Sequence, residues 1–276
     1  MRYHSSFWGL YMRILVVLCL LSVRCWAQIV QAHSLNDVME HFKDSDQSTF
    51  AVFDIDMVLI QPDDPAFQMA NIEMYYPVAK RIILSVPPEK RDILYTLTSL
   101  YFKSVLVDEK TPDFFRDLNR KGVASFGLTA SLTGSLLHIP NLEAWKCDHL
   151  RCQGIYFENE APCCESIVFC DLPPYRGNYP TFFGGVLFTN GGLNSKGKVL
   201  VTFLKDAHLC PKQIIFADDK EDNVKSVEQA LLEYNPSIKF VGLHYLGARY
   251  YPSQPLSEEE FAKRWEKLAA EAIELE

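Results

Sequence analysis

The chain has 276 residues and an acidic balance, with 35 Asp and Glu against 27 Lys and Arg. Hydrophobic residues make up 48% of it, and its length allows one large domain, with or without an inserted cap. The formal net charge of −8 argues against nucleic acid and anionic membranes as partners, because proteins bind both through Lys and Arg that neutralise phosphates. We therefore expect no nucleic-acid partner, and the sequence leaves the oligomeric state open.

Residues 1–27 have the pattern of a secretory signal peptide. Arg2 and Arg13 give a basic start, residues 14–23 form a short apolar core, and Ala27 closes a small-residue cleavage site. An apolar core of this length is too short to span a bilayer. We therefore expect export, cleavage after Ala27, no stable membrane insertion afterwards, and a periplasmic or secreted mature protein of residues 28–276.

Residues 28–47 predict a helix and a turn, with Ser34 as the helix N-cap. Apolar runs that predict strands follow at 50–53, 123–128, 185–189, 213–217 and 238–243. We also expect strands at 154–157 and 167–169, in a hairpin-like insertion that residues 190–192 would close.

Residues 66–110 are helical and apolar in pattern, with interruptions at Pro77 and Pro87. They predict a helical cap inserted between the first two strands of the sheet. Further helices are expected at 111–119, 142–150, 196–204, 224–232 and after the capping box that begins at Ser257. The apolar face of the last helix is expected to pack onto the domain, with a dimer seam as the alternative. The predicted α/β core comprises about 28–60 and 111–276, and it would carry a cysteine-rich insertion at about 140–190.

Six cysteines remain after the predicted cleavage, and five of them crowd into residues 147–170. The five are Cys147, Cys152, Cys163, Cys164 and Cys170, and the sixth is Cys210. In an exported protein this pattern predicts disulfides that staple a loop with little core of its own. A zinc site is the alternative, although the usual short Cys-x2-Cys pair is missing. Free thiols remain open as well.

Two acidic clusters follow two of the predicted strands. Asp54 and Asp56 come after the strand at 50–53, and the strand at 213–217 is followed by Asp218, Asp219 and Asp222. In a parallel sheet the carboxyl ends of the strands meet at one edge, where ligands bind. Clustered carboxylates need a cation between them, and hard oxygen ligands suit Mg²⁺. The sequence therefore predicts a magnesium site.

Two further residues extend this predicted site. Thr129 ends the strand at 123–128, where its hydroxyl could bind a phosphoryl oxygen or cap the next turn. Lys196 opens a helix, a position where a cation opposes the helix dipole unless an anion lies in front of it. Bound phosphate is one such anion, and a solvated surface lysine is the alternative.

Taken in order, Asp54-Ile55-Asp56-Met57-Val58, Thr129, Lys196 and Asp218-Asp219-Lys220-Glu221-Asp222 resemble the motifs of the haloacid dehalogenase (HAD) superfamily. The chain resembles in particular its exported bacterial phosphatase-like members, over roughly residues 49–241. This resemblance implies a Rossmann-like parallel sheet with helices on both faces and with cap insertions.

The resemblance also implies a role for each of these residues. Asp54 would be the nucleophile that forms an aspartyl-phosphate, and Asp56 the general acid and then the base. Thr129 and Lys196 would hold phosphoryl oxygens, with Lys198 as a competitor of Lys196. The implied magnesium ligands are Asp54, Asp56, Asp218, Asp219 and Asp222, and the choice between the last two is open.

We therefore expect an exported Mg²⁺-dependent hydrolase that acts on a small phosphorylated substrate, a phosphomonoester. Phosphoryl transfer needs an in-line nucleophile and neutralisation of the phosphoryl charge, which this set of residues supplies. One alternative is a binding or surface protein that keeps the scaffold with little turnover. A phosphomutase or a dehalogenase is another.

Overall fold

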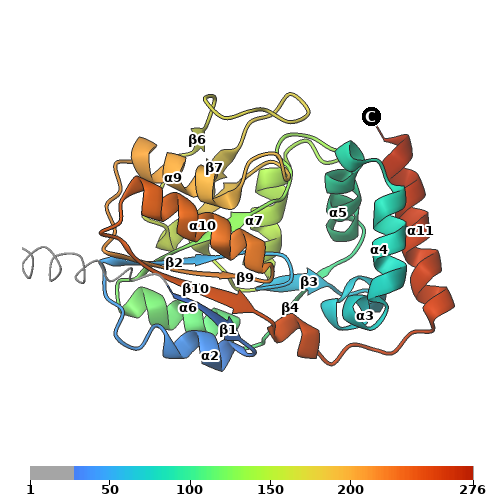
Figure 1. Cartoon of the computed structure of the whole chain (residues 1–276), viewed down its shortest axis with the longest axis horizontal. Coiled ribbons are helices and arrows are strands. Elements are labelled where there is room, and N and C mark those ends of the chain that lie inside the picture. Colours follow the sequence, from blue (N-terminus) through green and yellow to red (C-terminus); the bar gives the residue numbers. More distant parts are fainter. Residues whose placement is uncertain (1–27, 276) are drawn as a thin grey trace, which may run out of the picture.

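The computed structural model describes residues 28–275, so the predicted signal peptide lies outside the described residues. They form a mixed α/β fold around an eight-stranded sheet, with the strand order β1-β10-β9-β2-β5-β8-β7-β6 (Figure 1). The strands are β1 (Gln28–Ala32), β2 (Thr49–Phe53), β5 (Ala124–Thr129), β6 (Ile167–Val168), β7 (Thr181–Phe183), β8 (Val186–Phe188), β9 (Gln213–Asp218) and β10 (Lys239–Tyr245). The run from β1 to β8 is parallel, and β7 and β6 are antiparallel additions at one edge.

Helices cover both faces of this sheet, as predicted. One face packs on α2 (Leu35–Glu40), α6 (Thr111–Arg120), α7 (Leu142–Cys152) and α8 (Phe157–Glu160). The other face packs on α9 (Lys196–Asp206) and α10 (Glu221–Tyr234) (Figure 1). Strand β2 contributes to both cores, because Phe53 faces one layer and Val52 the other, and both side chains are buried. This alternation explains why β2 is apolar throughout.

A helical segment follows β2, at the place of the predicted cap, and we call it the cap. It contains α3 (Met69–Met74), α4 (Tyr76–Ser85) and α5 (Arg91–Leu100). The short antiparallel strands β3 (Ile60–Pro62) and β4 (Ser104–Leu106) lead into it and out of it.

The last helix, α11 (Glu258–Glu274), packs on α4 and α5 of the cap rather than on the sheet (Figure 1). The Ser257 capping box is present as predicted. The apolar face of α11 contacts cap aromatics, with Phe261 beside Tyr75 and Trp265 beside Phe67. Residues 258–274, which the sequence analysis assigned to the core, thus pack on the helices of the predicted cap at 66–110.

Residues 28–32 form a strand, so the prediction of a helix over 28–47 is wrong at its start. Gln28 to Ala32 pair with Val241 to Tyr245 of β10, and the β-branched Ile29 and Val30 suit this pairing. The helix begins only at Leu35, after the predicted Ser34 cap.

The predicted hairpin-like insertion is partly wrong. No strand forms over 154–157, because Gly154 has a φ of +78° and Phe157 begins α8. The hairpin joins β7 to β8 through Gly184 and Gly185, whose φ values of +56° and +76° suit a two-residue turn. Residues 190–192 instead follow β8 on the way to α9.

The six cysteines of residues 28–275 are free thiols, so the predicted disulfides are not formed. Cys147 is buried inside α7, and burial raises its pKa to about 12. Among the described residues, no group of metal-binding side chains includes a cysteine, which removes the zinc alternative for this structure. The segment is held instead by apolar packing, since Phe169, Leu172 and Phe182 are buried in the core on the α9 side.

Candidate active site

The two predicted acidic clusters meet at the carboxyl edge of the sheet. Strands β2 and β9 are hydrogen-bonded neighbours, and the backbone N–H of Asp54 donates to the carbonyl of Ala217 at 2.8 Å. The chain continues from β2 to β5 on one side, whereas β9 and β10 lie on the other side. This reversal is the place in an α/β sheet where a crevice opens for a ligand.

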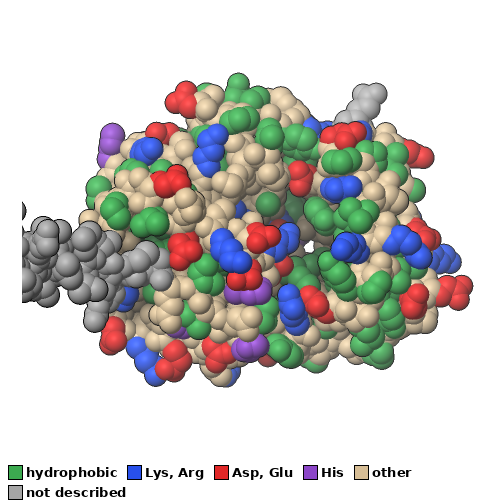
Figure 2. Space-filling view, in the orientation of Figure 1, with side chains coloured by type: hydrophobic (Ala, Val, Ile, Leu, Met, Phe, Trp, Pro, Cys, Tyr) green, Lys and Arg blue, Asp and Glu red, His purple; other side chains and the backbone are tan. Residues whose placement is uncertain are grey.

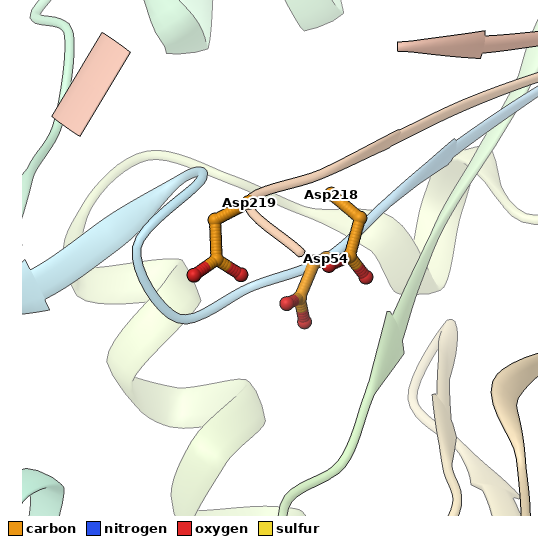
Figure 3. Close-up of side chains that lie close together, drawn as sticks. All are labelled: Asp54, Asp218 and Asp219. Atoms are coloured by element: carbon orange, nitrogen blue, oxygen red, sulfur yellow. The ribbon is translucent and has the colours of Figure 1, made fainter. Parts of the chain in front are cut away.

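Three carboxylates form the centre of this edge: Asp54, Asp218 and Asp219. Each offers an oxygen within 4.8 Å of the others, and Figure 3 shows the three side chains at the adjoining ends of β2 and β9. Asp218 is fully buried and Asp54 is 7% exposed. Three carboxylates so close and so poorly solvated repel one another, and a cation between them would relieve this repulsion.

Lys196 supplies one positive charge to the group. Its ammonium lies 2.7 Å from Asp54 Oδ1 and 2.7 Å from Asp218 Oδ2, and its side chain is buried. Burial alone would lower the pKa of Lys196, but the two carboxylates raise it well above its usual range. Lys196 therefore stays protonated. Lys198, the competing candidate, is exposed on α9 and is not part of the group.

One lysine does not neutralise three carboxylates. Burial raises the pKa of Asp54 well above its usual range, and the charges of Asp218 and Asp219 add to this effect. Burial likewise raises the pKa of Asp219 to about 6. The clustered hard oxygen ligands and the excess negative charge both fit a divalent cation such as Mg²⁺.

Asp222 is not part of this group, which corrects its predicted role as a metal ligand. It is exposed in the first turn of α10. The neighbouring Asn223 points to the site instead, and its amide donates to both oxygens of Asp218 at 3.0 and 3.1 Å. One residue along a helix turns a side chain by about 100°, so only one of the two can face the sheet edge.

Asp56 follows Asp54 closely in the chain, but its carboxylate contacts other residues. It is not one of the three carboxylates grouped around the predicted metal site. Its two oxygens accept from Lys146 Nζ at 2.8 and 3.1 Å, and Oδ2 also accepts from Ser131 Oγ at 3.2 Å. Met57 adopts a φ of +65° in the turn that follows, a conformation that is rare outside glycine.

Lys146 is a residue of this site that the sequence analysis missed. It lies on α7 with only 4% of its side chain exposed. The sequence carried a signal for it, because Leu142, Lys146 and Leu150 are spaced by four and so share one face of a helix. In the structure all three side chains are buried. Burial raises the pKa of Asp56, but the charge and hydrogen bonds of Lys146 outweigh burial, and the net pKa is lowered.

Thr129 ends β5 on the other side of β2, as predicted. Its buried hydroxyl accepts from the backbone N–H of Ser131 at 3.1 Å and lies 3.0 Å from the Ser131 hydroxyl. Thr129 therefore connects to Asp56 through Ser131. It also lines the cavity described next.

A cavity of about 400 Å³ separates the sheet edge from the cap. Asp54, Asp56, Thr129, Lys196 and Asp219 line its inner end. Side chains from α3, α4, α5, α7 and α11 line much of the rest, and Figure 2 shows the surface hollowed between the sheet and the cap. The site is thus recessed and partly shielded from water. None of the helices in residues 28–275 has the length and apolarity needed to cross a bilayer.

Comparison with known proteins gives relatives without a described activity. An uncharacterized protein of Rickettsia bellii is 25% identical over 241 residues, which cover 84% of this chain and 82% of that protein. An uncharacterized protein of Rickettsia felis is 26% identical over 248 residues, which cover 86% of this chain and 83% of that protein. No solved structure matches the chain. Residues 31–274 match one family model over nearly the whole described fold, and the chain therefore belongs to the family described as "Protein of unknown function (DUF2608)".

Proposed function

We propose that this protein is a Mg²⁺-dependent phosphomonoester hydrolase of the HAD type, exported through residues 1–27. One observation carries the proposal: Asp54 lies in a recessed cavity between Lys196 and two further carboxylates, with Asp56 two residues further along the chain. A nucleophile, a fixed cation and an acid–base group are the parts that phosphoryl transfer through a carboxylate requires. The motif resemblance supports the same assignment.

In the first step an oxygen of ionised Asp54 attacks phosphorus, the phosphorus–oxygen bond to the alcohol breaks, and Asp56, in its protonated form, gives the proton to the leaving oxygen. In the second step water attacks the aspartyl-phosphate, Asp56 takes the proton from that water, and the bond between Asp54 and phosphorus breaks. Phosphate leaves and both carboxyl groups return to their starting states. Such acid–base exchange contributes typically about 10²–10⁴-fold to a rate.

Asp54, Asp218 and Asp219 are the residues that would hold Mg²⁺, which when bound neutralises charge on the phosphoryl oxygens. Lys196 adds a second positive charge to the same end of the cavity. Ser131 and Thr129 bring hydroxyl groups there from the end of β5. The acidic surface charge leaves a small phosphorylated substrate, rather than a nucleic acid, as the expected partner.

Hydrolysis of a generic aryl phosphate by residues 28–276, which include every described element, tests the proposal. We expect turnover that needs Mg²⁺ and that Asp54→Asn abolishes. Asp222→Asn is the matched control, because it removes a carboxylate of the same stretch that lies outside the site. Turnover that survives in Asp54→Asn would contradict the aspartyl-phosphate mechanism.

A further inference from the structure

The cavity has two chemically different ends. Most of its charged groups gather at the sheet edge, around Asp54 and Lys196. Large apolar side chains line much of the part beneath the cap: Phe67, Met69, Ile72, Ile83, Trp145 and Trp265. Four of the cap elements contribute to it, since these residues come from the start of the cap, α3, α4 and α11 as well as from α7. Helix α5 adds polar residues to the lining: Asp92, Tyr95, Thr96, Thr98 and Ser99.

Three of the polar groups on the cap side already donate a hydrogen bond within the protein. The hydroxyls of Thr96 and Thr98 donate to backbone carbonyls of their own helix, at 2.8 and 2.7 Å. The indole N–H of Trp265 donates to the carbonyl of Ala66 at 2.8 Å. The donor hydrogens of these three groups are therefore not available to a ligand.

Two contacts join the cap to the sheet side of the cavity. Asp92 accepts from the backbone N–H of Gly192 at 3.0 Å, and the ammonium of Lys220 lies 5.7 Å from the centre of the Tyr95 ring. Two buried amide atoms in the described residues lack a partner near this region, on Gln61 and Gln68. Neither residue lines the cavity.

A ligand that reaches beneath the cap thus meets large apolar side chains, and the donors of Thr96, Thr98 and Trp265 there are already used. A sugar or a nucleoside there would bury hydroxyl groups without partners, and each would weaken binding roughly 5- to 150-fold. An alkyl or aryl group would gain affinity from burial. A cavity of about 400 Å³ falls in the range of pockets that enclose small molecules.

We propose that the substrates of this protein are monophosphate esters of apolar alcohols, with the phosphate at the sheet edge and the alkyl or aryl group beneath the cap. This inference rests on the proposed function for its chemistry. The predicted recognition of the apolar group can be tested by ligand binding, without turnover.

The test uses n-alkylphosphonates with two to eight carbons, in which phosphorus is bonded to carbon and no ester can be hydrolysed. Trp145 and Trp265 are the only tryptophans in residues 28–276, and both line the cavity, so intrinsic fluorescence reports binding there. With Mg²⁺ present, we expect affinity to rise about threefold to fourfold per methylene until the chain fills the cavity. Glucose 6-phosphate should bind more weakly than hexylphosphonate.

Ile83→Asn and Leu84→Asn form a matched pair of variants. Ile83 lines the cavity, whereas Leu84 is 56% exposed on the same helix and does not line it. We expect Ile83→Asn to flatten the dependence on chain length and Leu84→Asn to leave it intact. Circular dichroism would establish that both variants are folded.

Affinity that does not change with chain length, absence of binding, or tighter binding of glucose 6-phosphate would overturn the inference. The proposed hydrolysis would stand in those cases if aryl phosphate turnover still required Mg²⁺ and Asp54. Conversely, chain-length-dependent binding without any aryl phosphate turnover would support the apolar specificity and count against the hydrolase.

Discussion

The ammonium of Lys146 lies 2.8 Å from Asp56 Oδ1, although 90 positions separate the two residues in the chain. Because α7 is anchored in the core through Cys147 and Leu150, it holds the lysine in place. Asp56 therefore has a fixed orientation before any substrate binds.

Replacing Lys146 by Met should shift the pH profile of the proposed hydrolysis. Lys146 lowers the pKa of Asp56, so the pKa should rise in the variant and the profile of kcat/KM should move to higher pH. We also expect kcat/KM to fall by up to about 10²-fold, part of what an acid–base group contributes. Lys146→Arg, which keeps the charge, should retain the position of the profile. An unchanged profile in Lys146→Met would show that this ion pair does not control Asp56.

Asp219→Asn should stabilise the protein without metal and weaken its response to Mg²⁺. Because burial raises the pKa of Asp219 to about 6, the folded protein binds more protons than the unfolded chain between pH 3.8 and about 6. Stability of the metal-free protein therefore falls as pH rises through this window. Above it, the variant should gain about 1–3 kcal/mol, since one pKa unit corresponds to about 1.4 kcal/mol.

Thermal unfolding at pH 5 and pH 7.5, with and without Mg²⁺, measures both effects. In the unchanged protein the rise in Tm caused by Mg²⁺ should be larger at pH 7.5, because protons compete with the metal at pH 5. Asp222→Asn should keep this response. Loss of metal-free stability in Asp219→Asn at pH 7.5 would argue that the carboxylate is a structural group instead.

Gly197→Ala should destabilise the fold. A Cβ at Gly197 would lie 2.0 Å from the backbone carbonyl oxygen of Ser226, because α9 and α10 approach closely there. The overpacked helices would have to move apart, at a cost of about 1–3 kcal/mol, and would carry Lys196 with them. Urea unfolding should show the loss. Gly192→Ala is the control, since its Cβ would come no nearer than 4.0 Å to Asp92. Equal urea midpoints of unfolding for the two variants would contradict the close packing of α9 on α10.

Phe261→Ala should destabilise the protein by about 3–5 kcal/mol, the usual cost of removing a buried aromatic ring. Phe261 is fully buried where α11 packs on the cap, with its ring centre 5.0 Å from that of Tyr75. Ile273→Ala, at a position 45% exposed on the same helix, should change stability by no more than about 0.5 kcal/mol. Denaturant unfolding compares the two. A small effect of Phe261→Ala would mean that α11 is not needed to hold the cap.

Most of the sheet could be predicted from the sequence because its signals are local. The strand before Asp54 and the strand before Asp218 contain continuous apolar runs, and the apolar residues of both are buried in the middle of the sheet. The carboxyl ends of parallel strands lie at one edge, so the sequence predicts Asp54, Asp218 and Asp219 at the same edge. That β2 and β9 are direct neighbours there is decided by the tertiary structure. The helix predicted over 196–204 is present as α9, and the structure shows Ser195 as its N-cap.

The short edge strands were harder to predict because their signals are weak. Strand β6 has two residues, and β7 has three. The sequence predicts helix where residues 28–32 form a strand, since the pairing of that strand with β10 joins segments more than 200 positions apart. Nothing within the first segment shows where its partner lies.

By itself, the sequence determined the order of the site residues and the strands that carry Asp54, Thr129 and Asp218, because period and composition are properties of short stretches. Only the tertiary structure decided that Lys146 faces Asp56, that Asn223 rather than Asp222 turns toward the site, and that α11 completes the cap. Each of these depends on how helices rotate and pack against distant segments. That packing is set by the whole core, and no local pattern specifies it.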